Sequence, residues 1–314
     1  MIHRSVRSCL AFALLVIAPP ARAGGWRLVW SDEFDRPTID TSKWGFDVDC
    51  WGGGNNERQC YTASRSNAAI VGGKLVITAL HQHATGPAFP ESQRNDAVNR
   101  TARTTREYSS ARLTTRGKAS WRYGRIEIRA LLPQGQGTWP AIWMLPEDNA
   151  YGPWAASGEI DILEAVNLGV RCKTCPTGWE DTILGTLHFG DKWPANLHRG
   201  TEVHAPEVLK GFHTFAIEWQ SDRVIWQIDG RTYAERSANE WSTSGSKSPG
   251  APFDRKFHLI VNLAIGGGLA ESRGTGGVAT GGFPKRFAID WIRVWQKPDK
   301  TDRSPPGQPS EEGK

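Results

Sequence analysis

Apolar and polar residues alternate along many short segments of this chain, and residues typical of turns separate the segments. In residues 125–130 (RIEIRA), isoleucine and alanine alternate with arginine and glutamate. A period of two places the apolar side chains on one face of a β-strand. Strands are also predicted in segments 182–190, 212–220, 223–235, 257–267 and 287–296. No long segment has a helical period, so the pattern predicts an all-β sandwich.

Three segments lack this pattern. Residues 81–107 are polar, contain glycine and proline, and predict a long loop. Residues 266–282 are rich in glycine and predict a mobile loop, and residues 297–314 have the composition of a disordered tail. The one candidate helix is short, near residues 207–210. Because there is no repeat and no second type of composition, residues 24–296 are expected to form one domain.

The first 23 residues have the pattern of a secretory signal peptide. A basic start precedes an apolar run, and Ala21-Arg22-Ala23 supplies small residues for cleavage after Ala23. The run is too short to span a membrane, so we expect a secreted or periplasmic protein without a membrane partner. The formal net charge of +5 falls to +2 when this segment, with three arginines and no acid, is removed. So small a charge, without a basic cluster, argues against a nucleic-acid partner.

Four cysteines remain after this cleavage: Cys50, Cys60, Cys172 and Cys175. An even number in an exported chain favours disulfides, and four cysteines allow three pairings. Cys50–Cys60 would close a loop around residue 55 and Cys172–Cys175 a very short one, whereas cross-pairing would join the two loops. A four-cysteine zinc site is the alternative, although the first two cysteines are widely spaced for it.

Residues 157–167 (SGEIDILEAVN) place three acids among apolar residues, where unpaired carboxylates are costly. In a strand, Glu159 and Asp161 share a face, whereas Glu164 lies an odd number of residues further on. A one-residue β-bulge at residue 162 or 163 would bring all three acids to one face, and bulges are common beside active sites. The segment therefore predicts a strand at the floor of a polar cleft.

Two carboxylates on one face, with a third between them, suit the hydrolysis of glycosidic bonds. One acid must be ionised as nucleophile, and another must keep its proton for the leaving oxygen. Asp161, in the middle, can hydrogen-bond the nucleophile and help to hold the other two in different charge states. A surface strand with solvated acids and a calcium site are the alternatives, but the apolar flanks and the lack of carbonyl-rich loops disfavour them.

The segment GEIDILE (158–164) resembles the bulged signature of glycoside hydrolase family sixteen, and the chain looks like the laminarinases, or endo-β-1,3-glucanases, of that family. Other similar segments are LVWSDEFD (28–35), SKW (42–44), NNERQCYT (55–62), YGRIEIRALLPQGQGTWPAIWML (123–145), TLHFG (186–190), FHTFAIEW (212–219), FHLIVNLAIGG (257–267) and AIDWIRVWQ (288–296). The resemblance implies a jelly-roll β-sandwich of two curved antiparallel sheets with a concave substrate cleft. It also implies a monomer that cleaves β-1,3-glucan internally with retention of configuration.

The resemblance implies roles at matching positions: Glu159 as nucleophile, Asp161 as its assisting acid and Glu164 as general acid/base. The 15 tryptophans agree with stacking platforms for sugar rings, although a large β-core would use some of them. The residues expected to bind substrate are Asn55, Glu57, Arg125, Trp139, Trp143, Trp154 and His188. For His188, a hydrogen-bonded core histidine is the alternative.

No cofactor is expected to be required for this chemistry. Many members of the family hold one structural calcium ion far from the active site, and the resemblance implies ligands here from Glu33, Asp290 and the carbonyl of Gly72 or Gly73. Other polymers remain alternatives to β-1,3-glucan, namely mixed-linkage glucan, agarose and carrageenan. The bulged signature disfavours the lichenase-type members. A non-catalytic glucan-binding module is a third alternative, disfavoured because both catalytic glutamates are present.

Overall fold

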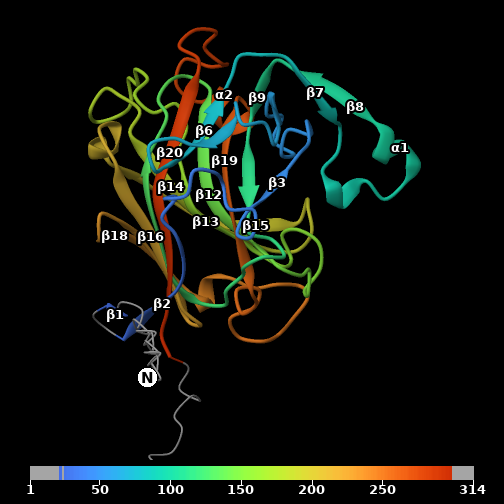
Figure 1. Ribbon diagram of the computed structural model, residues 1–314. Coiled ribbons are helices and arrows are strands. Elements are labelled where there is room, and N and C mark those ends of the chain that lie inside the picture. Colours follow the sequence, from blue (N-terminus) through green and yellow to red (C-terminus); the bar gives the residue numbers. More distant parts are fainter. Residues whose placement is uncertain (1–20, 23–24, 299–314) are drawn as a thin grey trace, which may run out of the picture.

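The computed structural model describes residues 21–22 and 25–298, and most of its regular structure is β-strand (Figure 1). Most of the expected signal peptide and of the expected C-terminal tail lies outside the described residues, so both stay predictions. None of the helices in the described part is long and apolar enough to cross a membrane.

One layer of the sandwich is a nine-stranded antiparallel sheet. Seven of its strands form one series of hydrogen-bonded neighbours. The other two branch from this series, because β6 pairs with β20 and β5 pairs with β6. The order of the strands is β1 (Ala21–Arg22), β2 (Trp26–Asp32), β20 (Lys285–Gln296), β11 (Gly124–Leu131), β16 (His213–Trp219), β17 (Arg223–Ile228) and β18 (Arg231–Ser237), with β5 (Ala68–Ile70) and β6 (Leu75–Ala79). The alternation in residues 125–130 therefore belongs to a central strand of this layer.

The other layer is a seven-stranded antiparallel sheet. Its order is β15 (Asn196–His204), β14 (Thr182–Gly190), β13 (Glu159–Glu164), β12 (Thr138–Pro146), β19 (Phe257–Ile265), β10 (Arg112–Thr114) and β3 (Gly45–Asp47). Buried side chains of both sheets, such as Ile126 of β11 and Ile142 of β12, belong to one apolar cluster. Burying these faces against each other is the main stabilisation available to two such sheets. The expected all-β sandwich of antiparallel sheets is confirmed.

Two small sheets and a few short helices complete the fold. β4 (Gln59–Tyr61) pairs with β9 (Tyr108–Ser110), and β7 (Ala84–Pro87) pairs with β8 (Arg103–Arg106). The short helices are η1 (Glu91–Gln93), α1 (Ala97–Thr101), η2 (Pro206–Leu209), η3 (Ala238–Glu240) and α2 (Gly268–Ser272). The candidate helix near 207–210 is therefore present as η2.

Residues 84–106, here called the arm, project from the body of the sandwich (Figure 1). A long loop was expected here, but the segment forms the β7–β8 pair with η1 and α1 between its strands. Asp96 is the N-cap of α1 and accepts a hydrogen bond from the backbone N–H of Asn99. The polar composition hid this structure because an exposed two-stranded arm needs few apolar residues.

The pairing of β13 is irregular at Ile162. On β12, Trp143 pairs with Asp161 and its neighbour Ile142 pairs with Leu163, so Ile162 is the additional residue between them. The pairing with β14 is also shifted between Asp161 and the end of β13. The expected β-bulge is present, and its extra residue is Ile162.

Trp226 of β17 crosses the core and supports this bulge. Its indole Nε1 donates a hydrogen bond of 2.8 Å to the backbone oxygen of Asp161, and its side chain is fully buried. Gly185 of β14 leaves the space that the indole needs, because a Cβ there would lie 2.6 Å from Cδ1 and Nε1 of Trp226. The bulge, the tryptophan and the glycine therefore depend on one another.

We expect Gly185→Ala to lower the free energy of unfolding by about 1–3 kcal/mol, because the added methyl overpacks the core against Trp226. Urea denaturation would measure the change. Gly200→Ala is a matched control on the adjacent strand, since the nearest atom to its Cβ would be Thr186 Oγ1 at 3.6 Å. The prediction is wrong if both variants unfold with the same free energy.

Candidate active site

A cleft of about 1250 Å³ crosses the face of the seven-stranded sheet that is turned away from the core. Residues from β10, β19, β12, β13, β14 and the edge strand β15 line it, so it runs across the strands. The arm and the loop before β4 also contribute to its lining. Because β13 lies in the middle of this series, its side chains are reached from both ends of the cleft.

The three acids of β13 come together in this cleft. Glu159, Asp161 and Glu164 all line it, whereas Ile162 and Leu163 are buried in the apolar core. The additional residue at the bulge returns Glu164 to the face of the other two acids. The structure thus brings the expected acids to one polar face.

Two tryptophans fix the outer carboxylates. The indole Nε1 of Trp154 donates to Glu159 Oε2 at 2.8 Å, and the indole Nε1 of Trp139 donates to Glu164 Oε1 at 2.9 Å. Each glutamate therefore has one oxygen held by a neutral donor. Such a bond orients the carboxylate and favours its ionised form without placing a positive charge beside it.

His188 lies beside the acids on β14. It is paired with Glu159 across the strands, and its Nε2 is 3.3 Å from Asp161 Oδ2 and 3.7 Å from Glu159 Oε1. Burial acts to lower the pKa of His188, but the adjacent acids, Asp161 above all, outweigh it and raise the pKa to about 9. The imidazole is therefore a cation near neutral pH, which disfavours the alternative of an ordinary core histidine.

Burial raises the pKa of all three acids. For Asp161 the pKa is raised well above its usual range, by burial first and then by the charges of Glu159 and Glu164. For Glu164, burial and the charge of Glu159 raise the pKa, against the hydrogen bond from Trp139. For Glu159, burial also raises the pKa, while His188 and Trp154 act to lower it. Glu159 has the most support for ionisation, and its two neighbours hold protons more readily.

Most of the residues expected to bind substrate also line the cleft. They are Asn55, Glu57, Trp139, Trp143, Trp154 and His188. Glu57 is buried and accepts hydrogen bonds from Gln59 Nε2 at 2.7 Å, the Tyr61 hydroxyl at 3.2 Å and Asn55 Nδ2 at 3.3 Å. Its carboxylate is thus already satisfied by the protein, and it holds Asn55 at the wall of the cleft.

Arg125, also expected to bind substrate, is in the wrong sheet. It belongs to β11 of the nine-stranded layer, is 3% exposed and does not line the cleft. Its guanidinium donates to Glu127 Oε1, Glu218 Oε1 and Gln227 Oε1 at 2.6–3.0 Å. Because the neighbouring Ile126 points into the core, Arg125 points to the outside of that layer, away from the substrate face.

Sequence reasoning missed several residues of the cleft, among them Arg112 and Asn262. Arg112 lies with its guanidinium carbon 5.3 Å from the centre of the Tyr61 ring and 5.6 Å from that of Trp143, and its Nε donates to Asp47 at 2.8 Å. The three-residue strand β10 is too short to give a periodic signal. Asn262 accepts from Trp143 Nε1 at 2.7 Å, and as the one polar residue in the apolar run 259–265 it did carry a signal.

Comparison with known proteins agrees with this geometry. Residues 87–293 match the sequence model of the protein family described as "Glycosyl hydrolases family 16". The chain belongs to glycosyl hydrolase family 16. It is therefore a glycoside hydrolase, and the three acids on the bulged strand lie where that chemistry needs them.

Individual relatives support the family assignment. A glucan endo-1,3-beta-glucosidase A1 of Niallia circulans is 38% identical over 290 residues, which are 88% of this chain but only 39% of that protein. A beta-glucanase of Rhodothermus marinus is 41% identical over 285 residues, covering 88% of this chain and 87% of the relative. The fold is similar to the crystal structure of the laminarinase catalytic domain of Thermotoga maritima. Superposing the two gives a TM-score of 0.68 and 36% sequence identity, over 86% of this chain and 98% of that chain.

The calcium ligands expected from the family do not fit an ion in this chain. The Glu33 carboxylate is occupied by Arg293, whose Nε and Nη2 donate to it at 3.0 and 2.8 Å. The carbonyl oxygen of Gly72 accepts from Lys74 Nζ at 3.1 Å. Two of the three expected ligands are thus already bound by cationic side chains.

Asp290, the third expected ligand, is also neutralised by cations. Its Oδ2 accepts from Arg129 Nη1 at 2.5 Å, and its Oδ1 is 3.6 Å from Lys74 Nζ. The ammonium of Lys74 therefore lies between Asp290 and the Gly72 carbonyl, where a divalent cation would be needed. A calcium ion there would face the repulsion of these cations, so the arrangement does not support the expected site.

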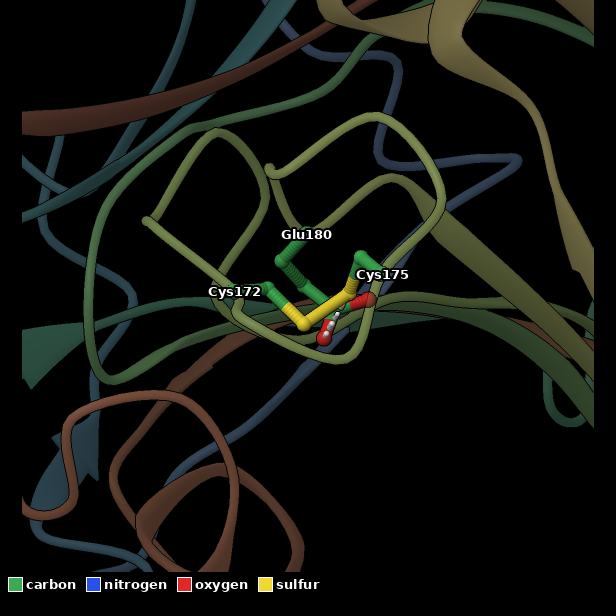
Figure 2. A group of neighbouring side chains, drawn as sticks. All are labelled: Cys172, Cys175 and Glu180. Carbon is green, nitrogen blue, oxygen red and sulfur yellow. Dashed lines mark hydrogen bonds between the residues drawn. A yellow bond between two sulfur atoms is a disulfide. The ribbon is translucent and has the colours of Figure 1, made fainter.

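Two clusters of metal-binding residue types occur in the described part of the chain, and neither favours an ion. One is the acidic centre itself, Glu159, Asp161 and His188, where the raised pKa of His188 favours a proton over a metal ion on the imidazole. The other is Cys172, Cys175 and Glu180 (Figure 2). Its two sulfur atoms form a disulfide, so neither is a thiolate ligand.

The disulfides of the described residues are Cys50–Cys60 and Cys172–Cys175. Both are local, and the cross-pairing and the four-cysteine zinc site, both left open by the sequence, are excluded. The first bridge joins the two ends of the loop that carries Asn55, at the wall of the cleft. It restricts the loop without joining the two sheets.

We expect chelation of calcium to leave the stability of the protein unchanged, because Lys74, Arg129 and Arg293 already neutralise the carboxylates of the expected site. The thermal unfolding midpoint would be measured with EDTA, with calcium and with magnesium. A bound ion would raise the midpoint as its concentration increases. A midpoint that falls in EDTA and recovers with calcium, but not with magnesium, would contradict the prediction.

Proposed function

We propose that this enzyme hydrolyses β-1,3-glucan at internal linkages, with retention of configuration. The observation that carries the proposal is the pair Glu159 and Glu164 on one bulged strand, each held by an indole donor, at the floor of a long cleft. The relatives named as endo-1,3-beta-glucosidase and laminarinase support the choice of polymer.

In the first step, the Glu159 carboxylate attacks the anomeric carbon, and the bond from that carbon to the glycosidic oxygen breaks. Glu164 gives its proton to this oxygen, which leaves with the rest of the chain as an alcohol. In the second step, Glu164 takes a proton from water, which attacks the anomeric carbon and releases Glu159. Two inversions at one carbon leave its configuration retained.

The electrostatics of the centre suit these roles. A nucleophile must be ionised while the acid next to it is protonated. The His188 cation and the indole of Trp154 favour the charge on Glu159, whereas burial and that charge favour the proton on Glu164. Asp161 lies between them; burial first, and then the charges of both glutamates, raise its pKa well above its usual range, and its contact with Glu159 acts to lower the pKa of the nucleophile.

The shape of the cleft supports internal cleavage. The acids lie on β13, with the cleft continuing to β15 on one side and to the loop before β4 and the arm on the other. A polysaccharide can therefore occupy subsites on both sides of the bond that is cleaved. Stacking and hydrogen bonds at these subsites align the scissile bond with the two acids.

Export from the cytoplasm is part of the proposal. The N-terminal pattern of a signal peptide motivates it, and two disulfides agree with an oxidising compartment outside the cytoplasm. We also propose that the enzyme acts as a monomer, because one chain carries all three acids and the whole cleft. Size-exclusion chromatography of the mature enzyme with light scattering would test the oligomeric state.

We expect Glu159→Gln to lower kcat on laminarin by on the order of 10⁴-fold, the scale seen when a covalent site loses an essential group, with glucan binding preserved. Activity would be measured as the release of reducing ends from laminarin and, in separate assays, from agarose and carboxymethyl-cellulose. Glucan binding would be measured by calorimetry. Glu207→Gln is a matched control, since Glu207 lies on η2 and pairs with Arg231. Turnover close to that of the wild type in Glu159→Gln would refute the role of Glu159, and equal kcat/KM on agarose would refute the polymer.

Retention of configuration is expected because Glu159 and Glu164 share one face of the bulged strand and lie close enough for the charge of Glu159 to raise the pKa of Glu164, as in a retaining pair. Proton NMR during the first minutes of hydrolysis would show which anomer forms before mutarotation. The β-anomer should appear first from laminarin. If the α-anomer came first, the double-displacement mechanism would be excluded.

We expect Trp139→Phe to move the alkaline limb of the pH profile of kcat/KM to higher pH. The Trp139 indole donates to Glu164 and acts to lower its pKa, so removing the N–H raises that pKa further. Glu164 must hold its proton in the first step, so activity is lost as pH rises through this pKa, and a higher pKa delays the loss. Trp143→Phe is the control, because that indole donates to the uncharged Asn262. A shift to lower pH, or equal shifts in both variants, would contradict the assignment.

A further inference from the structure

The cleft continues beyond the residues expected to bind substrate and reaches the arm. Pro90, Ser92 and Gln93 of the arm line it, together with Trp51 from the loop before β4. These four residues lie at the end of the cleft opposite to the edge strand β15. The arm thus adds a wall to one end of the substrate face, and the sequence, which predicted a loop here, did not assign it a role.

The base of this wall is fixed to the body of the enzyme. Cys50 donates its backbone N–H to Pro87 O at 2.7 Å and accepts from Arg106 Nε at 3.0 Å. Arg94 donates through Nη2 to Val48 O at 2.5 Å. Cys50 also forms the disulfide with Cys60, which closes the loop that carries Trp51 and Asn55. The arm is therefore held at three points rather than hinged at its two strands.

Trp51 occupies a defined place at this end. Its ring lies over Gly54, where a Cβ would come within 3.2 Å of Cη2, and its backbone N–H donates to Asp49 Oδ1 at 3.0 Å. The side chain is half-buried and lines the cleft, so part of the indole remains accessible to a ligand. A partly exposed indole in a cleft is a suitable platform for the apolar face of a sugar ring.

The arm supplies polar groups that the protein does not use. Within the described residues, neither the Ser92 hydroxyl nor the Gln93 amide has a hydrogen-bond partner, and both residues line the cleft and are exposed. Their backbone is nevertheless fixed, because Ser92 O accepts from Asn95 Nδ2 at 3.2 Å and Gln93 O from Asn99 Nδ2 at 3.0 Å. Donors and acceptors on a fixed backbone suit the hydroxyls of a sugar.

We propose that Trp51, Ser92 and Gln93 form an accessory sugar subsite, which binds a glucosyl unit of the β-glucan remote from the cleaved bond. The indole stacks on the ring, and the two arm residues hydrogen-bond its hydroxyls. This inference rests on the proposed function, since it requires a glucan chain in the cleft. Its consequence is a preference for chains that are long enough to reach the arm.

The test compares kcat/KM on a series of β-1,3-linked glucose oligomers, from the trisaccharide to the heptasaccharide, for the wild type, Trp51→Ala and Gln93→Ala. On the longest oligomers we expect kcat/KM to fall about 3- to 10-fold for Gln93→Ala, the effect of one or two neutral hydrogen bonds, and about 10-fold or more for Trp51→Ala. On oligomers too short to reach the arm, both variants should equal the wild type. Arg100→Ala is the control, since Arg100 is exposed on α1 of the arm and does not line the cleft.

Binding to the inactive Glu159→Gln enzyme provides the second measurement. The longest oligomer should bind more tightly than the shorter ones, and the additional substitution Gln93→Ala should reduce that difference by about the same 3- to 10-fold factor. The subsite is refuted if the variants lose the same factor on all lengths, or if Gln93→Ala equals the wild type on every length while the wild type hydrolyses the oligomers normally. A wild-type enzyme that cleaves none of these oligomers would instead refute the proposed function.

Discussion

The active site depends on one hydrogen bond behind it, from the indole of Trp226 to the backbone oxygen of Asp161. A bulge disrupts the regular ladder and leaves backbone groups in need of partners. Here the partner comes from the opposite sheet and reaches the bulge through the space at Gly185. Because Ile162 is the additional residue, Glu164 returns to the face of Glu159. The packing of the core thus decides the geometry of the chemistry on the other side of the strand.

Three acids on one short strand, Asp161 buried and the two glutamates half-buried, would repel one another if all were ionised. The structure lowers this cost with neutral indole donors on the two glutamates and with the imidazole of His188, which lies beside Asp161 and Glu159. Since the His188 cation lies toward Glu159, the charge is stabilised at one end of the strand and the proton is retained at the other. The position of His188 therefore helps to give Glu159 and Glu164 the different charge states that a nucleophile and an acid need.

The sequence predicted those features whose signal is local. The odd spacing of Glu164 after Asp161 required a bulge if all three acids were to share a face, and the bulge is present. The assignment of Arg125 failed because alternation tells which residues share a face but not which of two sheets a strand joins. Arg112 escaped notice because a strand of three residues has no period. The arm was predicted as a loop because exposed strands held to the body by arginines and backbone contacts lack the apolar pattern of the core.

The catalytic acids and the residues that shape the end of the cleft lie on different parts of the molecule. The acids and their partners lie on strands in the middle of a sheet whose other face is buried, where any displacement would cost packing. The end of the cleft opposite to β15 is formed by the loop before β4 and by the arm, which are fixed by local bonds such as Cys50–Cys60 and the hydrogen bond from Arg94 to Val48 O. Changes in these segments alter which sugars fit without moving the carboxylates. The same arrangement explains why three acids suffice to indicate the reaction, whereas the preference for a polymer has to be read from the walls around them.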